Sequence, residues 1–188
     1  MRHDLASLKT VLAKAPVSAL RAKLTRRVEY LALARYNPPN WLFTSGKPKR
    51  YNPAGVHCVY FGGDVHVTRI EYEEMWRGLQ GAHQPATEFI AEVHLRRVLD
   101  LTSPATLKVL KIAPGDLFKN WRRATRPTLT QLLGQAVNET KYFSAIRYPS
   151  AAGGRTGGLN IVIFRDCVQS SDSVRILGPT KKPLQKWP

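Results

Sequence analysis

The stretch from Arg50 to Glu74, RYNPAGVHCVYFGGDVHVTRIEYEE, concentrates the side chains of this sequence that are best suited to chemistry. Its Pro and Gly between Tyr51 and Gly55 predict a turn, and the run Val56–Phe61 predicts a short strand. Two glycines follow, and Asp64 is a suitable N-cap for the helix that the next residues predict. The sequence therefore predicts a turn, a strand and a helix that together carry an Arg, several Tyr and a group of Glu.

The predicted helix separates its glutamates onto different sides. At about 100° per residue, Glu71 and Glu74 fall on the side of the apolar Val67 and Ile70, whereas Glu73 points away. A carboxylate on the apolar side of a helix costs free energy unless a partner or a ligand uses it. Glu71 is therefore a candidate site residue. The simpler alternative is a Glu at the edge of that side whose carboxylate reaches solvent.

The chain is strongly basic, with a formal net charge of +16 over 188 residues. The excess of Lys and Arg is concentrated between Arg21 and Arg50 and returns in the tail around Lys181. Such a charge implies anionic partners, for example nucleotides, nucleic acid or an acidic protein. A solvated, solubilising surface explains the charge equally well, so charge alone identifies no ligand.

The two cysteines, Cys58 and Cys167, lie far apart and belong to no Cys/His cluster. This usage argues against a disulfide framework and against a zinc site, and it is typical of a reducing cytoplasm. No apolar run is long enough to span a bilayer, and no signal-peptide core is present. We therefore expect a cytoplasmic protein with no metal site and no membrane contact.

The first 35 residues are rich in Ala, Leu and Arg. They predict a helix from Leu5 to Ala15 and, after a Pro, a second helix capped by Ser18. Val28 to Arg35 fits either a helix or a strand, and we favour a strand because an Asn-Pro-Pro-Asn run ends it abruptly. Accordingly, we expect a helical extension over residues 1–27 and one main domain over residues 28–188.

The remainder of the chain predicts an α+β fold, with a mixed, mostly antiparallel sheet flanked by helices. The expected elements are a strand at Glu88–Leu95, a helix opening at Ser103-Pro104, a helix from Thr128, and strands at Tyr142–Arg147, Asn160–Phe164 and Ser173–Leu177. The Gly-rich loop over 153–158 lacks the spacing of a P-loop or a dinucleotide-binding turn, and it fits a simple connection. The Pro- and Lys-rich tail predicts no further element.

Several motifs occur here in a fixed order. An Arg at position 35 precedes RYNPAGVHCVYF, and Glu71 lies eleven residues beyond Tyr60. VLDLT at 98–102, a helix with Gln131-Leu132-Leu133-Gly134, and YPSAAGGRTGGLNIVIF follow. With this combination, the sequence resembles the RES-domain family, named for Arg, Glu and Ser, from about Val28 to the end of the chain.

The resemblance implies a fold related to ADP-ribosyltransferases and an enzyme that degrades NAD⁺, in some members by phosphorolysis. NAD⁺ is then the substrate, inorganic phosphate an optional co-substrate, and no cofactor is required. The family members are toxins of bacterial toxin–antitoxin pairs, neutralised by a helix-turn-helix antitoxin of the Xre type. The implied partners are therefore NAD⁺ and such an antitoxin, with DNA reached only through the antitoxin complex.

Carried over residue by residue, the resemblance implies the catalytic residues Arg35, Glu71 and Tyr60 and the substrate-binding residues Arg50, Tyr36, Ser150 and Asn160. These residue types suit the reaction. Cleavage of the nicotinamide–ribose bond passes through an oxocarbenium-like cation, which a desolvated carboxylate can stabilise. Arg guanidinium groups bind a pyrophosphate or an attacking phosphate through paired hydrogen bonds. Tyr60 can stack on a ring or bond a ribose, and Ser150 can donate to a phosphate or an amide.

Two alternatives belong to other functional classes. Glu71-Tyr72-Glu73 matches the ExE pattern of enzymes that transfer ADP-ribose to a protein, although two carboxylates at this spacing diverge on a helix. The charge of +16 is also compatible with a non-enzymatic, basic nucleic-acid-binding module.

Overall fold

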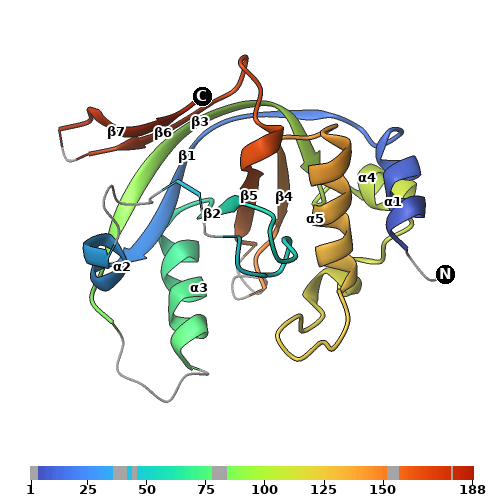
Figure 1. Cartoon of the computed structure of the whole chain (residues 1–188), viewed down its shortest axis with the longest axis horizontal. Helices are drawn as coiled ribbons and strands as arrows, with labels where there is room; N and C mark the ends of the chain where they lie inside the picture. The colour runs from blue at the N-terminus through green and yellow to red at the C-terminus, as the bar shows by residue number, and fades with distance from the viewer. Residues whose placement is uncertain (1–3, 36–41, 44–45, 78–83, 152–156, 179) are drawn as a thin grey trace.

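The computed structural model of the chain describes residues 4–35, 42–43, 46–77, 84–151, 157–178 and 180–188 (Figure 1). Its elements are α1 (Leu5–Leu12), β1 (Ser18–Glu29), α2 (Tyr30–Arg35), β2 (Cys58–Gly62), α3 (Val65–Arg77), β3 (Ala86–Asp100), α4 (Pro104–Leu110), the 3₁₀ helix η1 (Pro114–Phe118), α5 (Leu129–Thr140), β4 (Ala145–Pro149), β5 (Leu159–Phe164), the 3₁₀ helix η2 (Arg165–Cys167), β6 (Ser173–Leu177) and β7 (Pro183–Trp187). The α+β class expected from the sequence is confirmed.

The strands of the described residues form a single mixed sheet that curls back on itself. Its order is β1-β2-β5-β4-β3-β6-β7, and β1 pairs in addition with β3. Only the β3–β4 pair is parallel, so the sheet is mostly antiparallel, as expected. In Figure 1 the long β1 and β3 arch over β2, β4 and β5. This curvature leaves an inner side between the two halves of the sheet.

The pairing of β1 with β3 explains why the segment after Ser18 is extended rather than helical. Apolar Leu20, Ala22 and Leu24 alternate with the exposed Arg21 and Lys23, which is the period of a strand with one buried side. The register places Leu24 opposite Ala91. The expected second helix is therefore wrong, because the period-2 pattern and a long antiparallel partner outweigh the helix propensity of Ala, Leu and Arg. Strand β1 also runs across the expected boundary between residues 27 and 28.

Two further expectations for secondary structure are wrong. The segment expected as a strand over 28–35 contains the end of β1 and then the short helix α2. The C-terminal tail, expected to have no regular structure, forms the edge strand β7, which pairs with β6. Its Pro183 starts the strand, where a missing N–H is tolerated. The strand β7 was not visible locally, because it depends on its partner strand β6.

Two hydrophobic cores lie on opposite sides of β2, β4 and β5. The inner core fills the curl of the sheet and joins Val59 and Ile163 to Leu24 and Val174 of the arching strands. The outer core joins the other side of the same strands to α1, α4 and α5, with Phe164 and Leu133 among its fully buried members. Between the cores, β2, β4 and β5 are held rigidly, and their ends carry several of the residues discussed below. In the part of the chain that the structure describes, no helix is both long and apolar enough to cross a membrane.

Candidate active site

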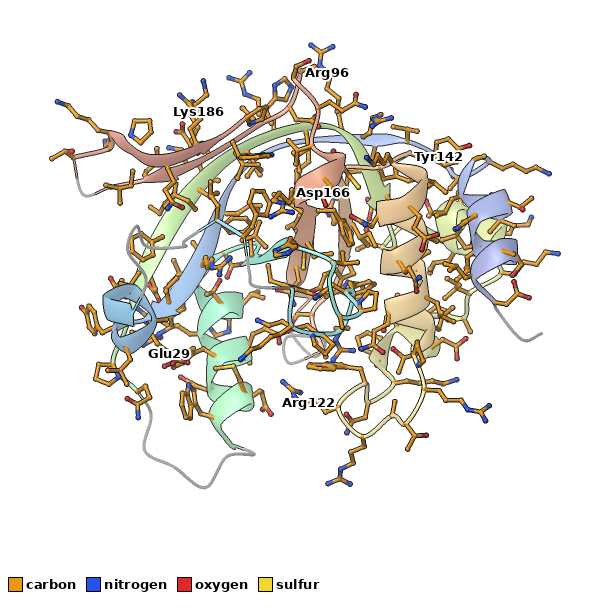
Figure 2. All side chains as sticks on the ribbon, in the orientation of Figure 1. Glu29, Arg96, Arg122, Tyr142, Asp166 and Lys186 are labelled. Atoms are coloured by element: carbon orange, nitrogen blue, oxygen red, sulfur yellow. The ribbon has the colours of Figure 1, made fainter. Side chains whose placement is uncertain are left out.

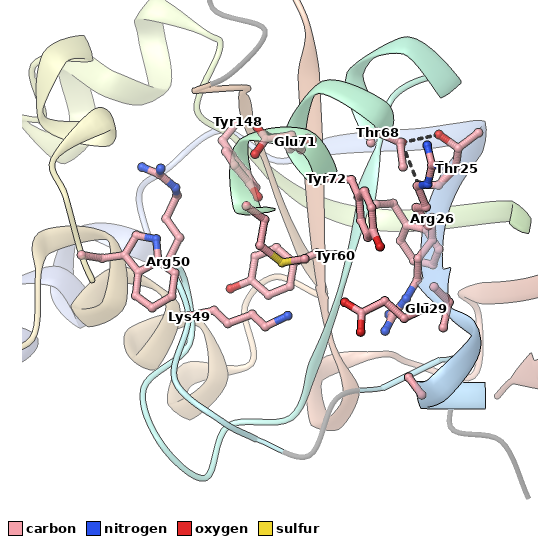
Figure 3. Close-up of a pocket in the computed structure, with 18 of the residues that line it drawn as sticks. Thr25, Arg26, Glu29, Lys49, Arg50, Tyr60, Thr68, Glu71, Tyr72 and Tyr148 are labelled. Carbon is pink, nitrogen blue, oxygen red and sulfur yellow. Dashed lines mark hydrogen bonds between the residues drawn. The ribbon is translucent and has the colours of Figure 1, made fainter. Parts of the chain in front are cut away.

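A cleft of about 410 Å³ lies where β1, β2 and α3 meet, beside the loop that precedes β2 (Figure 3). Side chains from β1, α2, that loop, β2, α3, β4, β5 and the connection between η1 and α5 line it. Its volume falls within the roughly 300–1,000 Å³ of sites that bind small molecules and cofactors. The cleft is thus large enough for an organic ligand and is built from segments spread over most of the chain.

Glu71 projects from α3 into this cleft. The helix is capped as expected, because the Val67 N–H donates to Asp64 Oδ1 at 2.8 Å. Glu71 Oε1 accepts two hydrogen bonds, one from the Ser150 hydroxyl and one from Asn160 Nδ2, the latter at 2.8 Å. Among the described residues, the second carboxylate oxygen, Oε2, accepts no hydrogen bond. The carboxylate is therefore held through one oxygen, while the other is left for a ligand.

The ends of β4 and β5 fix the two partners of Glu71. Tyr148 of β4 lies opposite Asn160 of β5, and just beyond it the Ser150 N–H donates to the Gly158 carbonyl at 2.8 Å. Ser150 is fully buried and Asn160 is 7% exposed. A buried hydroxyl and a buried amide need partners, and Glu71 supplies one to each. The sheet thus brings together three residues that are far apart in the sequence.

Lys49 and Arg50 belong to the turn before β2 and line the cleft, and helix α5 contacts the same turn. Gln131 Nε2 donates to the Lys49 carbonyl at 3.0 Å. Gly134 lies so close to the turn that a Cβ there would be 1.6 Å from the Tyr51 carbonyl oxygen. The Gln-Leu-Leu-Gly motif of the sequence therefore positions the basic turn, although neither Gln131 nor Gly134 lines the cleft.

Tyr60 also holds this turn through hydrogen bonds. Its hydroxyl accepts a hydrogen bond from the Tyr51 N–H at 2.9 Å and donates one to Asn52 Oδ1 at 2.8 Å. Burial, and secondarily the neighbouring Cys58, raises the pKa of Tyr60 well above its ordinary value, so the phenol stays neutral. Because the hydroxyl proton is already donated to Asn52, the ring of Tyr60 is the part that it offers to a ligand.

The cleft is positively charged. Of the side chains that the structure describes, five cations line it together with the carboxylates of Glu29 and Glu71: Arg26, Arg27, Lys49, Arg50 and Arg122. Three of these cations lie over aromatic rings, with Arg27 4.8 Å from the Tyr72 ring centroid, Lys49 5.6 Å from that of Tyr60 and Arg122 4.9 Å from that of Trp121. Stacking orients a cation without neutralising it, although Arg27 in addition forms an ion pair with Glu88 at 3.6 Å. The cleft therefore favours an anionic ligand that also presents flat rings.

Backbone carbonyls anchor two of the arginines. Arg26 Nη1 donates to the Leu42 carbonyl, and Arg50 Nη1 donates to the Leu117 carbonyl, each at 2.9 Å. A guanidinium has five N–H donors, so one such bond leaves others for a ligand. Arg26 is half-buried, and its desolvation lowers its pKa to about 10, which still leaves it charged near neutrality. Desolvation, and then the charge of Arg26, also lowers the pKa of Lys49, although Lys49 is exposed at the cleft.

The structure joins five of the seven residues predicted for the site. Ser150 and Asn160 each donate a hydrogen bond to Glu71, and Arg50 and Tyr60 line the same cleft as Glu71. The two other residues were placed in the segment expected to be a strand. Arg35 ends helix α2, but its side chain is not among those that the structure describes. Tyr36 lies outside the described residues. The catalytic and binding roles themselves stay predictions.

Sequence reasoning missed Arg26 and Arg27 of β1. Both line the cleft, but an expected helix over this segment gave no reason to place either beside Glu71. The signal was present in the alternation of Leu20 to Leu24, which predicts a strand leading straight into the Arg pair. Tyr72, next to Glu71 on α3, was considered only as part of an ExE pattern. Its ring supports Arg27, and its hydroxyl donates to the Gln84 carbonyl at 2.7 Å.

The fold and the cleft together define an α+β protein with a basic cleft, in which two hydrogen bonds hold the Glu71 carboxylate. Comparison with known proteins gives the class a name. The family model of the RES domain matches residues 21–183, which is most of the chain. The chain belongs to the RES domain family. The match begins inside β1, so this strand is part of the family's domain.

The fold also has solved counterparts. A chain of the crystal structure of the M. tuberculosis MbcT–MbcA toxin–antitoxin complex superposes with a TM-score of 0.66 at 15% sequence identity. The match covers 94% of this chain and 96% of that one. No curated protein sequence matches. At this identity the structural likeness establishes the fold, which spans nearly the whole of both chains.

Proposed function

We propose that this chain is a RES-type toxin that degrades NAD⁺ by cleaving its nicotinamide–ribose bond. The observation that carries the proposal is the Glu71 carboxylate, fixed through one oxygen by Ser150 and Asn160 in a cleft with five cations. An enzyme of this reaction needs a carboxylate at a developing cation and positive groups at a pyrophosphate. Family membership and the fold shared with a chain of a toxin–antitoxin complex support the toxin assignment.

In this proposal, Glu71 stabilises the cation that forms at the ribose carbon. The bond between that carbon and the pyridinium nitrogen breaks, and its electron pair leaves with the nitrogen, so nicotinamide departs as a neutral molecule. Glu71 Oε2 faces the positive charge that develops on the ribose, in a cleft where solvent screens it less than in bulk water. Water or inorganic phosphate then forms the new bond to the same carbon, which yields ADP-ribose and a proton or ADP-ribose 1″-phosphate.

The cations of the cleft hold the pyrophosphate and, for phosphorolysis, the attacking phosphate. Arg50 and Arg26 are anchored by backbone carbonyls, so little rotamer entropy is lost when they bind an anion. The stacked pairs Arg27–Tyr72 and Arg122–Trp121 offer positive charge together with flat apolar surface, which suits the adenine and nicotinamide rings. No metal or cofactor enters this scheme.

Transfer of ADP-ribose to a protein is the alternative reaction. In enzymes of that kind the two carboxylates of an ExE pair act together, but Glu71 lines the cleft whereas Glu73 is exposed and does not. The arrangement therefore favours a small acceptor, water or phosphate. Incubation of the purified chain with NAD⁺, with and without phosphate and cell extract, separates the three outcomes. Free ADP-ribose indicates hydrolysis, ADP-ribose 1″-phosphate indicates phosphorolysis, and labelled macromolecule indicates transfer.

We further propose that an antitoxin restrains the chain in the bacterial cytoplasm. An enzyme that depletes NAD⁺ harms its own host, so an inhibitor of the Xre helix-turn-helix type is expected from the family. The basic cleft favours an inhibitor segment that ends in a carboxylate, which mimics a phosphate of the substrate. Expression of the chain alone should arrest growth as cellular NAD⁺ falls, and co-expression of the neighbouring small reading frame should restore growth. Arrest at unchanged NAD⁺ contradicts the mechanism.

A further inference from the structure

The outer side of the sheet carries a second cationic surface, away from the cleft. We define the outer sheet patch as Arg21 and Lys23 of β1, Glu92, His94 and Arg96 of β3, Arg175 of β6 and Lys186 of β7. All of these side chains are exposed except that of Glu92, which is half-buried. Figure 2 shows Arg96 and Lys186 projecting from the side of the sheet opposite to Glu29 and Arg122, which belong to the cleft.

The strand register makes the patch a regular array. Lys23 lies opposite Glu92, Glu92 opposite Arg175, and Arg175 opposite Lys186, so one row crosses four strands. Three gaps of about 4.8 Å between strands give the row a length of about 14 Å. A duplex rises about 3.4 Å per base pair, so this row matches the length of roughly four base pairs.

The charge of the patch is largely uncompensated. Glu92 Oε2 pairs with Arg175 Nη2 at 2.8 Å. Among the described residues, Arg21, Lys23, Arg96 and Lys186 form no ion pair. Four cations without an ion pair on one face of the sheet produce a local positive field that an anionic partner can neutralise.

The residue types of the outer sheet patch distinguish between a protein, a single-stranded nucleic acid and a duplex as its anionic partner. Protein interfaces place aromatic anchors at their centre, and proteins that bind single strands stack bases on aromatic rings. The exposed apolar residues that alternate with the patch residues on the same side of β3 and β7, Ile90 and Leu184, are aliphatic. Trp187, next to Lys186, is also exposed, but its ring packs against Phe43 on the other side of the sheet. A face of Lys and Arg side chains without aromatic rings among them suits a ligand that presents charge alone. The backbone of a nucleic-acid duplex is such a ligand.

We propose that the outer sheet patch binds the phosphate backbone of duplex DNA without sequence preference. The chain then contributes phosphate contacts of its own, in contrast to the expectation that DNA is reached only through an antitoxin. Because the patch and the cleft lie on opposite sides of the sheet, DNA binding and turnover of a small substrate do not compete for the same residues.

The test measures binding of the full chain to a fluorescent duplex of about 20 base pairs by anisotropy, between about 50 and about 200 mM salt. The double variant Lys23→Gln/Lys186→Gln removes two phosphate contacts. It should reduce the slope of log K against log salt by about 1.8, which is roughly a 60-fold weaker affinity at about 0.1 M salt. The control Lys14→Gln/Lys108→Gln removes the same charge at exposed positions of other segments and should leave the slope unchanged.

Every other outcome overturns the proposal. Equal weakening in both double variants means that net charge alone attracts DNA. Loss of binding in Arg122→Gln instead places the contact in the cleft. No measurable binding by the wild-type chain excludes the patch as a DNA site, and weaker binding of a co-expressed antitoxin with unchanged DNA binding assigns the patch to a protein partner. Turnover of NAD⁺, measured in parallel, should be unaffected in both double variants.

Discussion

Replacement of Glu71 by Gln is the sharpest test of the proposed chemistry. Both hydrogen bonds to Glu71 end on Oε1, and a Gln side chain keeps an oxygen at that place. The substitution therefore preserves the contacts with Ser150 and Asn160 and changes only the group at the position of Oε2. The charge is removed while the shape is kept, so a loss of activity reports the charge itself.

The expected size follows from Coulomb's law. A full charge at about 4 Å contributes about 4 kcal/mol at an effective dielectric constant of about 20. At 1.36 kcal/mol per factor of ten, kcat should fall about 10³-fold. The free energy of unfolding should change much less, because two charge-assisted hydrogen bonds become neutral ones, which costs about 1–2 kcal/mol in total.

The assay follows NAD⁺ consumption by the purified variant under saturating substrate, and denaturant unfolding measures stability in parallel. Glu74→Gln is the matched control, since it removes the same charge from an exposed position of the same helix. A folded Glu71→Gln variant that retains kcat within about tenfold of wild type refutes the role assigned to the carboxylate. So does a large loss in Glu74→Gln with none in Glu71→Gln.

Three further substitutions test the basic turn. Arg50→Lys keeps the charge but loses the planar guanidinium group that forms paired hydrogen bonds, so kcat/KM for NAD⁺ should fall roughly 10- to 100-fold. Wild-type kinetics in this variant would mean that Arg50 is only a surface charge. Gly134→Ala places a Cβ against the Tyr51 carbonyl and should lower the free energy of unfolding, measured by denaturant melts, by about 3 kcal/mol or more. The control Gly115→Ala adds its Cβ in open space and should change this free energy little. Tyr60→Phe leaves the Tyr51 N–H and its other partner in the turn unpaired and should cost about 2–4 kcal/mol of stability while the ring stays in the cleft. An unchanged melting curve for Tyr60→Phe contradicts the anchoring role.

The parts of the site that the sequence predicted are those set by short-range patterns. Asp64 as a cap and the angle of Glu71 on α3 follow from helix geometry alone. The strand that begins near Asn160 follows from an apolar run that comes directly after a Gly-rich loop. The contact of Glu71 with Ser150 and Asn160 could not be derived in this way, because it depends on the pairing of β4 with β5. The family resemblance implied that these residues belong to one site, and the hydrogen bonds give the physical reason why they lie together.

The errors near the N-terminus have one origin, which is the competition between helix propensity and strand pairing. Residues 18–29 contain good helix formers, but as β1 they pair with β3 along almost their whole length. Such a partner lies some 70 residues away in the sequence and leaves no local trace beyond the alternation of side chains. An expected helix over this segment gives no reason to place Arg26 beside Glu71. The role of Arg35, which the family resemblance implies, stays a prediction.

The basic turn and the Glu71 carboxylate form two walls of the cleft. Different elements anchor the two walls, and the side chain of Tyr148 joins them. The basic turn rests on α5, whereas Glu71 rests on the ends of β4 and β5. Tyr148 belongs to both, because it lies opposite Asn160 in the sheet and its ring packs 4.4 Å from that of Tyr51 in the turn. Burial, with Tyr51 and Glu71 nearby, raises the pKa of Tyr148 well above its ordinary value, so it joins the walls as a neutral, rigid ring. The distance between the cations and the carboxylate is therefore set by packing around Tyr148 rather than by the ligand. A preset spacing of this kind favours catalysis, since little reorganisation is needed when charge develops on the substrate.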